Sequence, residues 1–193
     1  MYPKIAKEWH PTKNDSLKPE DITAGSEKKF WWKCPEELDH EWEASVRNRT
    51  HNKSGCPYCV GRKVSVANSL ASLFPSIAKQ WHPTKNGSLK PEQVVAGSNT
   101  KVWWKCVNGP DHEWEAQVNL RTGKYKSGCP CCSGRKPSVT NSLASLFPSI
   151  AKQWHPTKNK PLTPEQVTAG TCKKYWWKCP EEPDHEWEAS VRN

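Results

Sequence analysis

Hydrophobic residues between positions 68 and 81 recur at steps of three and four, the spacing that places side chains on one face of a helix. They are Leu70, Leu73, Phe74, Ile77, Ala78 and Trp81. Ser69 is a suitable cap for a first short helix, and Pro75 suits the first position of a second. His82-Pro83 ends the pattern, and Asn86-Gly87 indicates a turn. This segment therefore predicts two short helices with one apolar face.

A third helical signal follows this turn. Pro91-Glu92-Gln93 resembles a helix start with proline in its first turn, and in a later copy Thr163 precedes the same pattern as a cap. Ala96-Gly97-Ser98 then predicts a turn into an extended segment.

Around residues 29–47 the pattern changes to alternation, which is typical of strands with one buried face. The first segment divides into Phe30, Trp32 and Cys34 on one face and Lys29, Trp31 and Lys33 on the other. The second divides into His40, Trp42, Ala44 and Val46 against Glu41, Glu43, Ser45 and Arg47. An antiparallel hairpin of the two segments brings Cys34 close to His40, with Trp32 and Trp42 packed behind them.

The same strings return along the chain. Trp-Trp-Lys-Cys, five residues and His-Glu-Trp-Glu occur at 31–43, 103–115 and 176–188, an interval of 72 or 73 residues. An internal repeat of this length indicates an array of similar units. We predict three modules: 1–67, which lacks the first helical turn; 68–139, which is complete; and 140–193, which stops before a Cys-x-x-Cys pair. Each is expected to be a small α+β module, a β-hairpin with short helices.

A module of this size needs more than an aliphatic core. Hydrophobic residues make up 34% of the 193-residue chain, and 12 of them are tryptophans. Units of about 70 residues commonly require a metal or disulfides in addition to their core. Cysteine supplies the candidates, because Gly-Cys-Pro-x-Cys follows the hairpin in modules 1 and 2.

Each complete module offers three cysteines and one histidine, a tetrahedral zinc set. The predicted ligands are Cys34, His40, Cys56 and Cys59 in module 1 and Cys106, His112, Cys129 and Cys132 in module 2. Disulfides are the alternative, but nine cysteines is an odd count and no signal peptide precedes them. We therefore expect two structural Zn²⁺ ions in an intracellular protein. Cys131 and Cys172 are expected to be free thiols, although Cys131 could compete with Cys132.

These motifs resemble the treble-clef zinc finger, or probable zinc-ribbon, repeat family. The resemblance rests on Trp-His-Pro-Thr-Lys-Asn, Trp-Trp-Lys-Cys, His-Glu-Trp-Glu-Ala and Gly-Cys-Pro-x-Cys, and it covers nearly the whole chain. It implies the same eight ligands, and that some relatives carry an attached nuclease domain. The five residues between Cys34 and His40 form a longer turn than the family pattern leads us to expect, without loss of a ligand.

In module 3, Cys179 and His185 make only a half site. We favour a fragment of a longer, monomeric array as the explanation. The alternative is a dimer in which two chains pool these residues into a shared Cys2His2 site.

Formal net charge is +9, and two sites of three thiolates and one Zn²⁺ lower it by two, to +7. Tryptophans among cations are typical of nucleic-acid platforms. The predicted contacts are Trp31, Lys33, Arg47, Arg49, Trp103, Lys105, Arg121, Arg135, Lys136, Trp176 and Lys178. The competing interpretation packs Trp31 and its counterparts against the helix that carries Trp9 or Trp81. The acidic residues of the return strand also argue against a uniformly cationic face.

The leading functional hypothesis is therefore non-catalytic binding of DNA or RNA. A protein-interaction scaffold is the second candidate. A nuclease is the third, because Asp39-His40 and Asn48 beside a metal knuckle resemble His-Asn-His nucleases; there the histidine must be free as a base, whereas His40 and His112 are needed as ligands. His10, His82 and His155 are expected to bond backbone at helix ends. No apolar run reaches transmembrane length.

Overall fold

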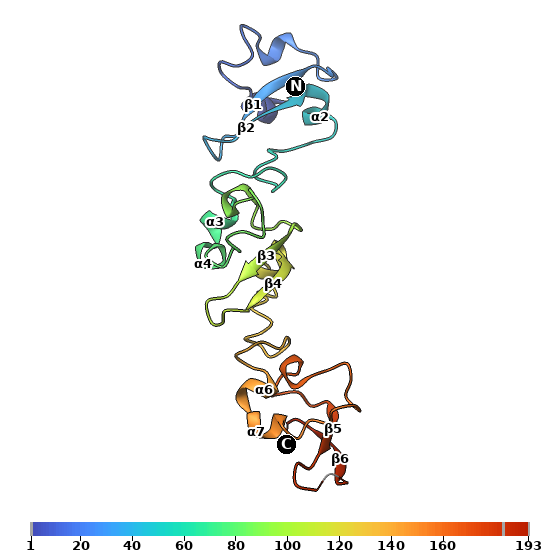
Figure 1. Cartoon of the computed structure of the whole chain (residues 1–193). Coiled ribbons are helices and arrows are strands. Elements are labelled where there is room, and N and C mark those ends of the chain that lie inside the picture. Colours follow the sequence, from blue (N-terminus) through green and yellow to red (C-terminus); the bar gives the residue numbers. More distant parts are fainter. Residues whose placement is uncertain (1, 183, 193) are drawn as a thin grey trace. The chain divides into compact units, whose positions relative to one another are not determined.

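The computed structural model describes residues 2–182 and 184–192 as three successive groups of short elements (Figure 1). The first group is α1 (Pro3–Ala6), η1 (Pro19–Asp21), β1 (Lys29–Lys33), β2 (Glu41–Ser45) and α2 (Val46–Thr50). The second is α3 (Leu70–Leu73), α4 (Pro75–Ala78), η2 (Pro91–Gln93), β3 (Lys101–Lys105), β4 (Glu113–Gln117) and α5 (Val118–Thr122). The third is α6 (Leu143–Leu146), α7 (Pro148–Ala151), η3 (Pro164–Gln166), β5 (Lys174–Lys178) and β6 (Glu186–Ser190). The predicted α+β class, hairpins with short helices, is confirmed.

The chain divides into two compact units that do not coincide with the three sequence repeats. One unit comprises Met1–Ala78 with Ser88–Thr100, and the other comprises Lys79–Gly87 with Lys101–Asn193. The helical part of repeat 2 thus falls with repeat 1, and its hairpin falls with repeat 3. The module boundaries at 67 and 139 stay predictions. No helix in the described parts of the chain is long and apolar enough to cross a membrane.

Each hairpin is antiparallel and pairs two tryptophans directly across its strands. The partners are Trp32 with Trp42, Trp104 with Trp114, and Trp177 with Trp187. A further tryptophan from the preceding helical segment meets the first member edge-on; the ring centroids of Trp9 and Trp32 are 5.3 Å apart. Trp32 and Trp104 are almost completely buried. Indoles therefore form the centre of each small core, as the scarcity of aliphatic residues predicts.

The alternation that we predicted through Arg47 ends at Ser45. Ser45 is extended, and its side-chain oxygen accepts a hydrogen bond from the backbone N–H of Asn48 at 3.3 Å. It thereby caps α2, which begins at Val46. Val46 and Arg47 are consequently helical and not extended. The helix directs the side chain of Arg49 toward the core.

The short helices at the start of repeats 2 and 3 are capped by serines, as predicted for Ser69. Ser69 and Ser142 accept hydrogen bonds from the backbone N–H groups of Ser72 and Ser145, each at 3.2 Å. We call residues 68–74 and 141–147 the leaders of these repeats. Each leader forms an isolated bridge with the segment that follows the 3-10 turn, Ser69 with Val95 and Ser142 with Thr168.

The leader of repeat 2 is also fastened to the loop that ends repeat 1. The Asn68 amide donates hydrogen bonds to the carbonyl oxygens of Tyr58 and Lys63, at 2.7 and 2.9 Å, and accepts one from the N–H of Ser65 at 2.8 Å. Asn141 makes the same three bonds in the next repeat, to Cys131, Lys136 and Ser138. An asparagine therefore couples each Cys-Pro-x-Cys loop to the leader that follows it.

Candidate metal centres

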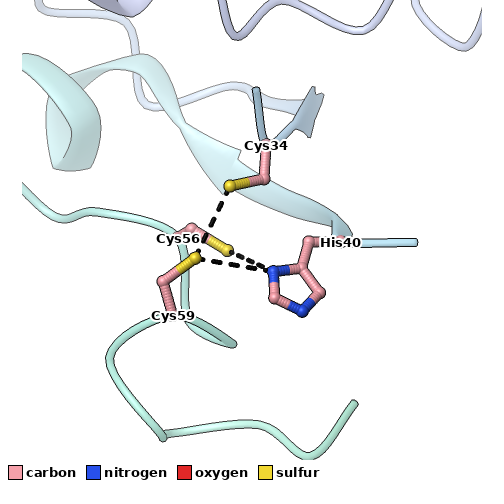
Figure 2. A group of neighbouring side chains, drawn as sticks. All are labelled: Cys34, His40, Cys56 and Cys59. Atoms are coloured by element: carbon pink, nitrogen blue, oxygen red, sulfur yellow. Dashed lines mark hydrogen bonds between the residues drawn. The ribbon is translucent and has the colours of Figure 1, made fainter. Parts of the chain in front are cut away.

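The first site forms where the hairpin turn meets the loop after α2 (Figure 2). Cys34 directly follows β1 and His40 directly precedes β2, and the N–H of Cys34 donates to the carbonyl of His40 at 3.0 Å. Cys56 and Cys59 come from the returning loop. Their four donor atoms lie within 4.8 Å of one another, with three of the residues buried. The hairpin thus brings Cys34 and His40 together, as its register predicts.

The second site repeats this arrangement with Cys106, His112, Cys129 and Cys132. The N–H of Cys106 again donates to the carbonyl of its histidine at 3.0 Å. No third group of this kind occurs among residues 2–182 and 184–192. Two complete Cys3His sites are therefore present in the described chain.

The separations between donor atoms test whether zinc would fit. Tetrahedral bonds of about 2.3 Å to sulfur and about 2.0–2.1 Å to nitrogen put two sulfurs about 3.8 Å apart and a sulfur and nitrogen about 3.6 Å apart. In site 1, the Cys34 and Cys59 sulfurs are 3.5 Å apart, and His40 Nδ1 lies 3.6 and 3.5 Å from the sulfurs of Cys56 and Cys59. These separations match a tetrahedral centre with Nδ1 as the nitrogen donor.

The corresponding distances in site 2 agree equally well. The sulfurs of Cys106 and Cys132 are 3.7 Å apart. His112 Nδ1 lies 3.7 Å from Cys129 Sγ and 3.5 Å from Cys132 Sγ. Thiolate and imidazole donors in a closed set of four are the ligands of structural zinc. The residues present therefore fit the ion.

Hydroxyl groups contact the Nε2 atoms of both histidines of these sites and orient their rings. His40 Nε2 lies 2.9 Å from Ser65 Oγ, and His112 Nε2 lies 3.1 Å from Ser138 Oγ and 2.7 Å from Thr140 Oγ1. Such contacts fix the ring and leave Nδ1 for the metal. Sequence reasoning missed these residues, although the recurrence of Arg-Lys-x-Ser after each Cys-Pro-x-Cys was an available signal.

Without a cation the sites resist full ionisation. Desolvation, followed by the neighbouring sulfurs of Cys34 and Cys56, raises the pKa of Cys59 to about 12. Desolvation also raises the pKa of Cys129, against the backbone N–H groups of Cys132 and Cys131, which lower it. Collecting three thiolates therefore requires a positive ion, and binding that ion releases protons.

Cys132 differs from Cys59 and Cys129. The Asn108 side-chain amide donates to its sulfur at 3.5 Å and, as the largest effect, lowers the pKa of Cys132. Site 1 has Glu36 at the matching position of its loop. The two sites therefore share a ligand set but differ in one donor to sulfur.

The remaining cysteines are not members of these groups, although the Cys131 thiol contacts Cys129. Cys131 is buried, and Cys172 is exposed. In repeat 3, Cys179 is half-buried and accepts a bond from the N–H of Glu182 at 3.4 Å, while His185 is exposed. The array fragment and the shared Cys2His2 dimer both stay predictions.

The histidines of the Trp-His-Pro motifs bond backbone, as predicted. His10 Nδ1 accepts from the N–H groups of Thr12 and Lys13 at 3.3 and 3.1 Å, and its Nε2 lies 3.1 Å from Glu41 Oε1. His82 and His155 occupy the same arrangement with Glu113 and Glu186. An Nδ1 that accepts two hydrogen bonds has no lone pair left for a metal.

Two predicted nucleic-acid contacts lie in the core. Arg49 is 2% exposed, pairs with Glu8 and lies over the rings of Trp32 and Trp42. Arg121 is 4% exposed and lies over Trp104 and Trp114. Their helices, α2 and α5, turn both guanidinium groups inward, which removes them from any surface track.

The other predicted contacts reach the surface in varying degree. Arg47, Arg135 and Lys136 are exposed, and the strand lysines are half-buried: Lys33, Lys105 and Lys178. Trp31, Trp103 and Trp176 are also half-buried, and each carries a lysine over its ring at 4.4, 4.5 or 4.0 Å. Trp9 packs on Phe30 and Trp32, on the other face of β1.

Hairpins with short helices, closed by three cysteines and one histidine, define a class of small zinc-finger-type modules. Comparison with known families agrees and is more specific. The chain belongs to the family described as the probable treble clef zinc finger domain, which matches residues 5–62, 77–135 and 150–193. No curated protein matches this chain. Both leaders fall between the matched ranges.

Proposed function

We propose that this protein is a non-catalytic nucleic-acid-binding array whose two complete sites hold structural Zn²⁺. The Zn²⁺ assignment rests on the donor separations and on a ligand set that leaves no position for substrate. Both ring nitrogens of His40 are engaged, Nδ1 beside the sulfurs and Nε2 with Ser65. This histidine therefore has no nitrogen free to act as a general base, which supports the non-catalytic role.

The zinc assignment is tested by metal analysis and by spectroscopy. Protein purified with zinc should contain two ions per chain. Replacement with Co²⁺ should give the intense visible bands of tetrahedral thiolate coordination, and Cys56→Ser with Cys129→Ser should abolish them. A chain that binds one ion or none, or cobalt spectra without thiolate bands, would contradict the assignment.

One recurring cluster carries the nucleic-acid proposal. In repeat 1, Lys13 Nζ lies over the Trp31 ring and 2.6 Å from Glu41, and Lys33 approaches the same carboxylate at 3.7 Å. Repeats 2 and 3 contain the same set of two lysines, one tryptophan and one glutamate in the same contacts. We call each set a Trp–Lys cluster.

Each Trp–Lys cluster retains one positive charge. Two lysines and one glutamate sum to +1, because the nearby histidine accepts backbone hydrogen bonds at Nδ1 and is neutral. Ammonium groups beside an indole offer a phosphate contact next to an aromatic surface, the combination found in single-strand binding sites. Exposed Arg47, Arg135 and Lys136 would extend the contact, whereas Arg49 and Arg121 would not.

The test is fluorescence anisotropy of labelled single- and double-stranded oligonucleotides with zinc-loaded protein at several salt concentrations. We expect an association constant whose logarithm falls linearly with the logarithm of the salt concentration. Lys13→Gln, Lys33→Gln, Lys85→Gln and Lys105→Gln together should weaken binding and reduce the salt slope by roughly one for each lost phosphate contact.

The matched control removes four charges elsewhere: Lys4→Gln, Lys28→Gln, Lys124→Gln and Lys152→Gln. These lysines are exposed and lie outside the Trp–Lys clusters. Equal loss in both variants would reduce the effect to net charge and contradict the cluster. Absence of binding to any oligonucleotide at low salt would overturn the function, and would favour a protein-interaction scaffold, for which the apolar groove below is the supporting observation.

A further inference from the structure

Repeat 1 contains an apolar groove that its counterparts do not leave open. The cavity has a volume of about 540 Å³ and lies beside α1 and η1. Its lining includes Ile5, Trp9, Ile22, Ala24, Trp32 and Val46. Volumes of this order suit the anchoring side chains of a ligand or peptide.

Repeats 2 and 3 show what fills the equivalent place. The segment Pro19–Ala24 of repeat 1 corresponds in sequence to 91–96 and 164–169, on which the leaders dock. In repeat 3, the N–H of Leu143 donates to the carbonyl of Val167 at 2.8 Å, and the N–H of Ala169 donates to the carbonyl of Asn141 at 3.0 Å. In repeat 2, Leu70, Val94, Ala96 and Asn68 make the same pair of bonds, at 2.8 and 3.1 Å.

The leucine of each leader is the anchor. Leu70 and Leu143 are both 0% exposed, and Val94 and Val167 beneath them are buried. Ile22, at the matching position of repeat 1, is only half-buried. Among the described residues, moreover, no backbone hydrogen bond reaches the carbonyl of Ile22 or the N–H of Ala24. The groove therefore combines an empty apolar pocket with one unpaired backbone acceptor and one unpaired donor.

We propose that this groove binds a leader segment of the type Asn-Ser-Leu-x-x-Leu from outside residues 1–193. Both leaders of residues 1–193 are already buried against their own repeats, so neither is available. The occupant has defined chemistry: a leucine for the pocket, backbone atoms for Ile22 and Ala24, and a serine that caps the following turn. Because each leader follows a Cys-Pro-x-Cys loop, such a contact joins repeat 1 to a further zinc-finger repeat.

The test uses a synthetic peptide with the sequence of residues 65–74 and the isotope-labelled, zinc-loaded full chain. We expect saturable changes in the NMR signals of the Ala24 N–H and the Trp32 indole, with no change at Val94 or Val167. A peptide with aspartate in place of the leucine at position 70 should bind at least about tenfold more weakly, since the leucine side chain makes the apolar contact in the pocket.

A second form of the protein supplies the matched control. Val-Ala-Asn-Ser-Leu-Ala-Ser joined directly before Met1 places a leader in the register of repeat 2, so it should fill the groove from within. The added peptide should then cause no change at Ala24. The proposal is overturned if the peptide causes no saturable change at millimolar concentration, if the aspartate peptide binds equally well, or if the extended chain still binds the peptide.

Discussion

Repeats 1 and 3 contain an identical stretch of sequence in two different environments. Residues 39–47 and 184–192 both read Asp-His-Glu-Trp-Glu-Ala-Ser-Val-Arg. Both form a return strand with the same partners, Trp32 with Trp42 and Trp177 with Trp187. Trp42 is nevertheless 3% exposed and Trp187 39%. The local sequence thus determines the strand and its register, whereas residues outside this stretch determine how far its tryptophan is buried.

The difference lies in what covers the return strand. In repeat 1 the strand leads into α2, whose Arg49 lies over Trp42 at 5.3 Å, and then into the loop whose Tyr58 stacks on His40 with 4.8 Å between centroids. In repeat 3 the described chain ends at Arg192, directly after the strand. The helix and the Cys-Pro-x-Cys loop therefore bury a hairpin that forms without them.

Removal of the closing cysteines should make repeat 1 resemble repeat 3. Cys56→Ser with Cys59→Ser eliminates two of four ligands, and structural zinc contributes roughly 10–16 kcal/mol of apparent binding free energy. We expect loss of one zinc per chain and rapid hydrogen exchange at the Trp42 indole, approaching that of Trp187, measured by NMR.

Cys172→Ser is the control for this change, because Cys172 is exposed and outside both sites. It should leave two ions bound and Trp42 protected. Slow exchange at Trp42 in the double variant would show that α2 buries the strand without the metal.

After loss of the metal, the next largest effect is expected from removal of Arg49, which covers Trp42. Arg49→Ala removes its contacts with Glu8 and with the carbonyl of Ser54, together with its packing on Trp32 and Trp42. We expect a loss of roughly 2–4 kcal/mol in the free energy of unfolding, somewhat less than for a fully buried pair because Glu8 is partly exposed. Urea unfolding of zinc-loaded protein measures this.

Arg47 offers a comparison within the same helix. Its side chain is 57% exposed and pairs with exposed Glu27, so Arg47→Ala should change stability by less than about 1 kcal/mol. Equal effects of the two substitutions would contradict the assignment of Arg49 to the core.

The contrast between the two arginines also shows where sequence reasoning succeeds. The two groups of four Cys and His residues could be predicted because Cys-x5-His and Cys-x2-Cys recur intact in two repeats, and the hairpin because its alternation is regular over five residues. Ser69 and Pro75 could be predicted from local capping chemistry alone. The structure confirms the hairpin, the caps and the grouping of the eight side chains.

The missed features depend on contacts between distant residues. Arg49 reads as a surface charge until Ser45 ends the strand and α2 turns the guanidinium toward two indoles. Ser65 lies 25 residues after His40 in an irregular segment, where no periodicity predicts which hydroxyl meets the ring. Periodicity reveals which face is buried, but not which polar side chain completes a buried contact.

A contact that is present in both repeat 1 and repeat 3 should contribute equally to the stability of the two repeats. The Asn14 amide accepts from the N–H of Trp31 at 2.8 Å and donates to its carbonyl at 2.9 Å, and Asn159 bonds Trp176 in the same way at 2.9 and 2.7 Å. Asn14→Ala and Asn159→Ala should each cost about 1–3 kcal/mol, because the N–H of Trp31 or Trp176 loses its partner, whereas the carbonyl keeps the bond from the N–H of His10 or His155.

Local hydrogen exchange at the N–H groups of Trp31 and Trp176 measures both effects. Thr157→Ala, at an exposed position near Asn159, is the control. A much smaller effect in repeat 3 would show that the hairpin of repeat 3 is held less firmly, and that closure by metal also stabilises the register.

The smallest expected effect compares the two complete sites. Protons compete with zinc for thiolates, so a thiol with a lowered pKa keeps its metal to lower pH. The Asn108 amide lowers the pKa of Cys132, whereas desolvation raises the pKa of Cys106 and Cys129 in the same site. The bond from Asn108 should therefore lower the pH at which site 2 releases zinc, followed through the ring signals of His112 by NMR, with His40 as the reporter for site 1.

Asn108→Ala should raise the pH at which site 2 releases zinc, because the thiolate of Cys132 loses a hydrogen-bond donor. Cys132 is exposed, and three thiolates take up protons together, so we expect the midpoint to rise by about half a pH unit or less. Glu36→Asn should lower the midpoint of site 1, since it introduces the same donor. If neither substitution moves its site, the two centres differ through burial and not through Asn108.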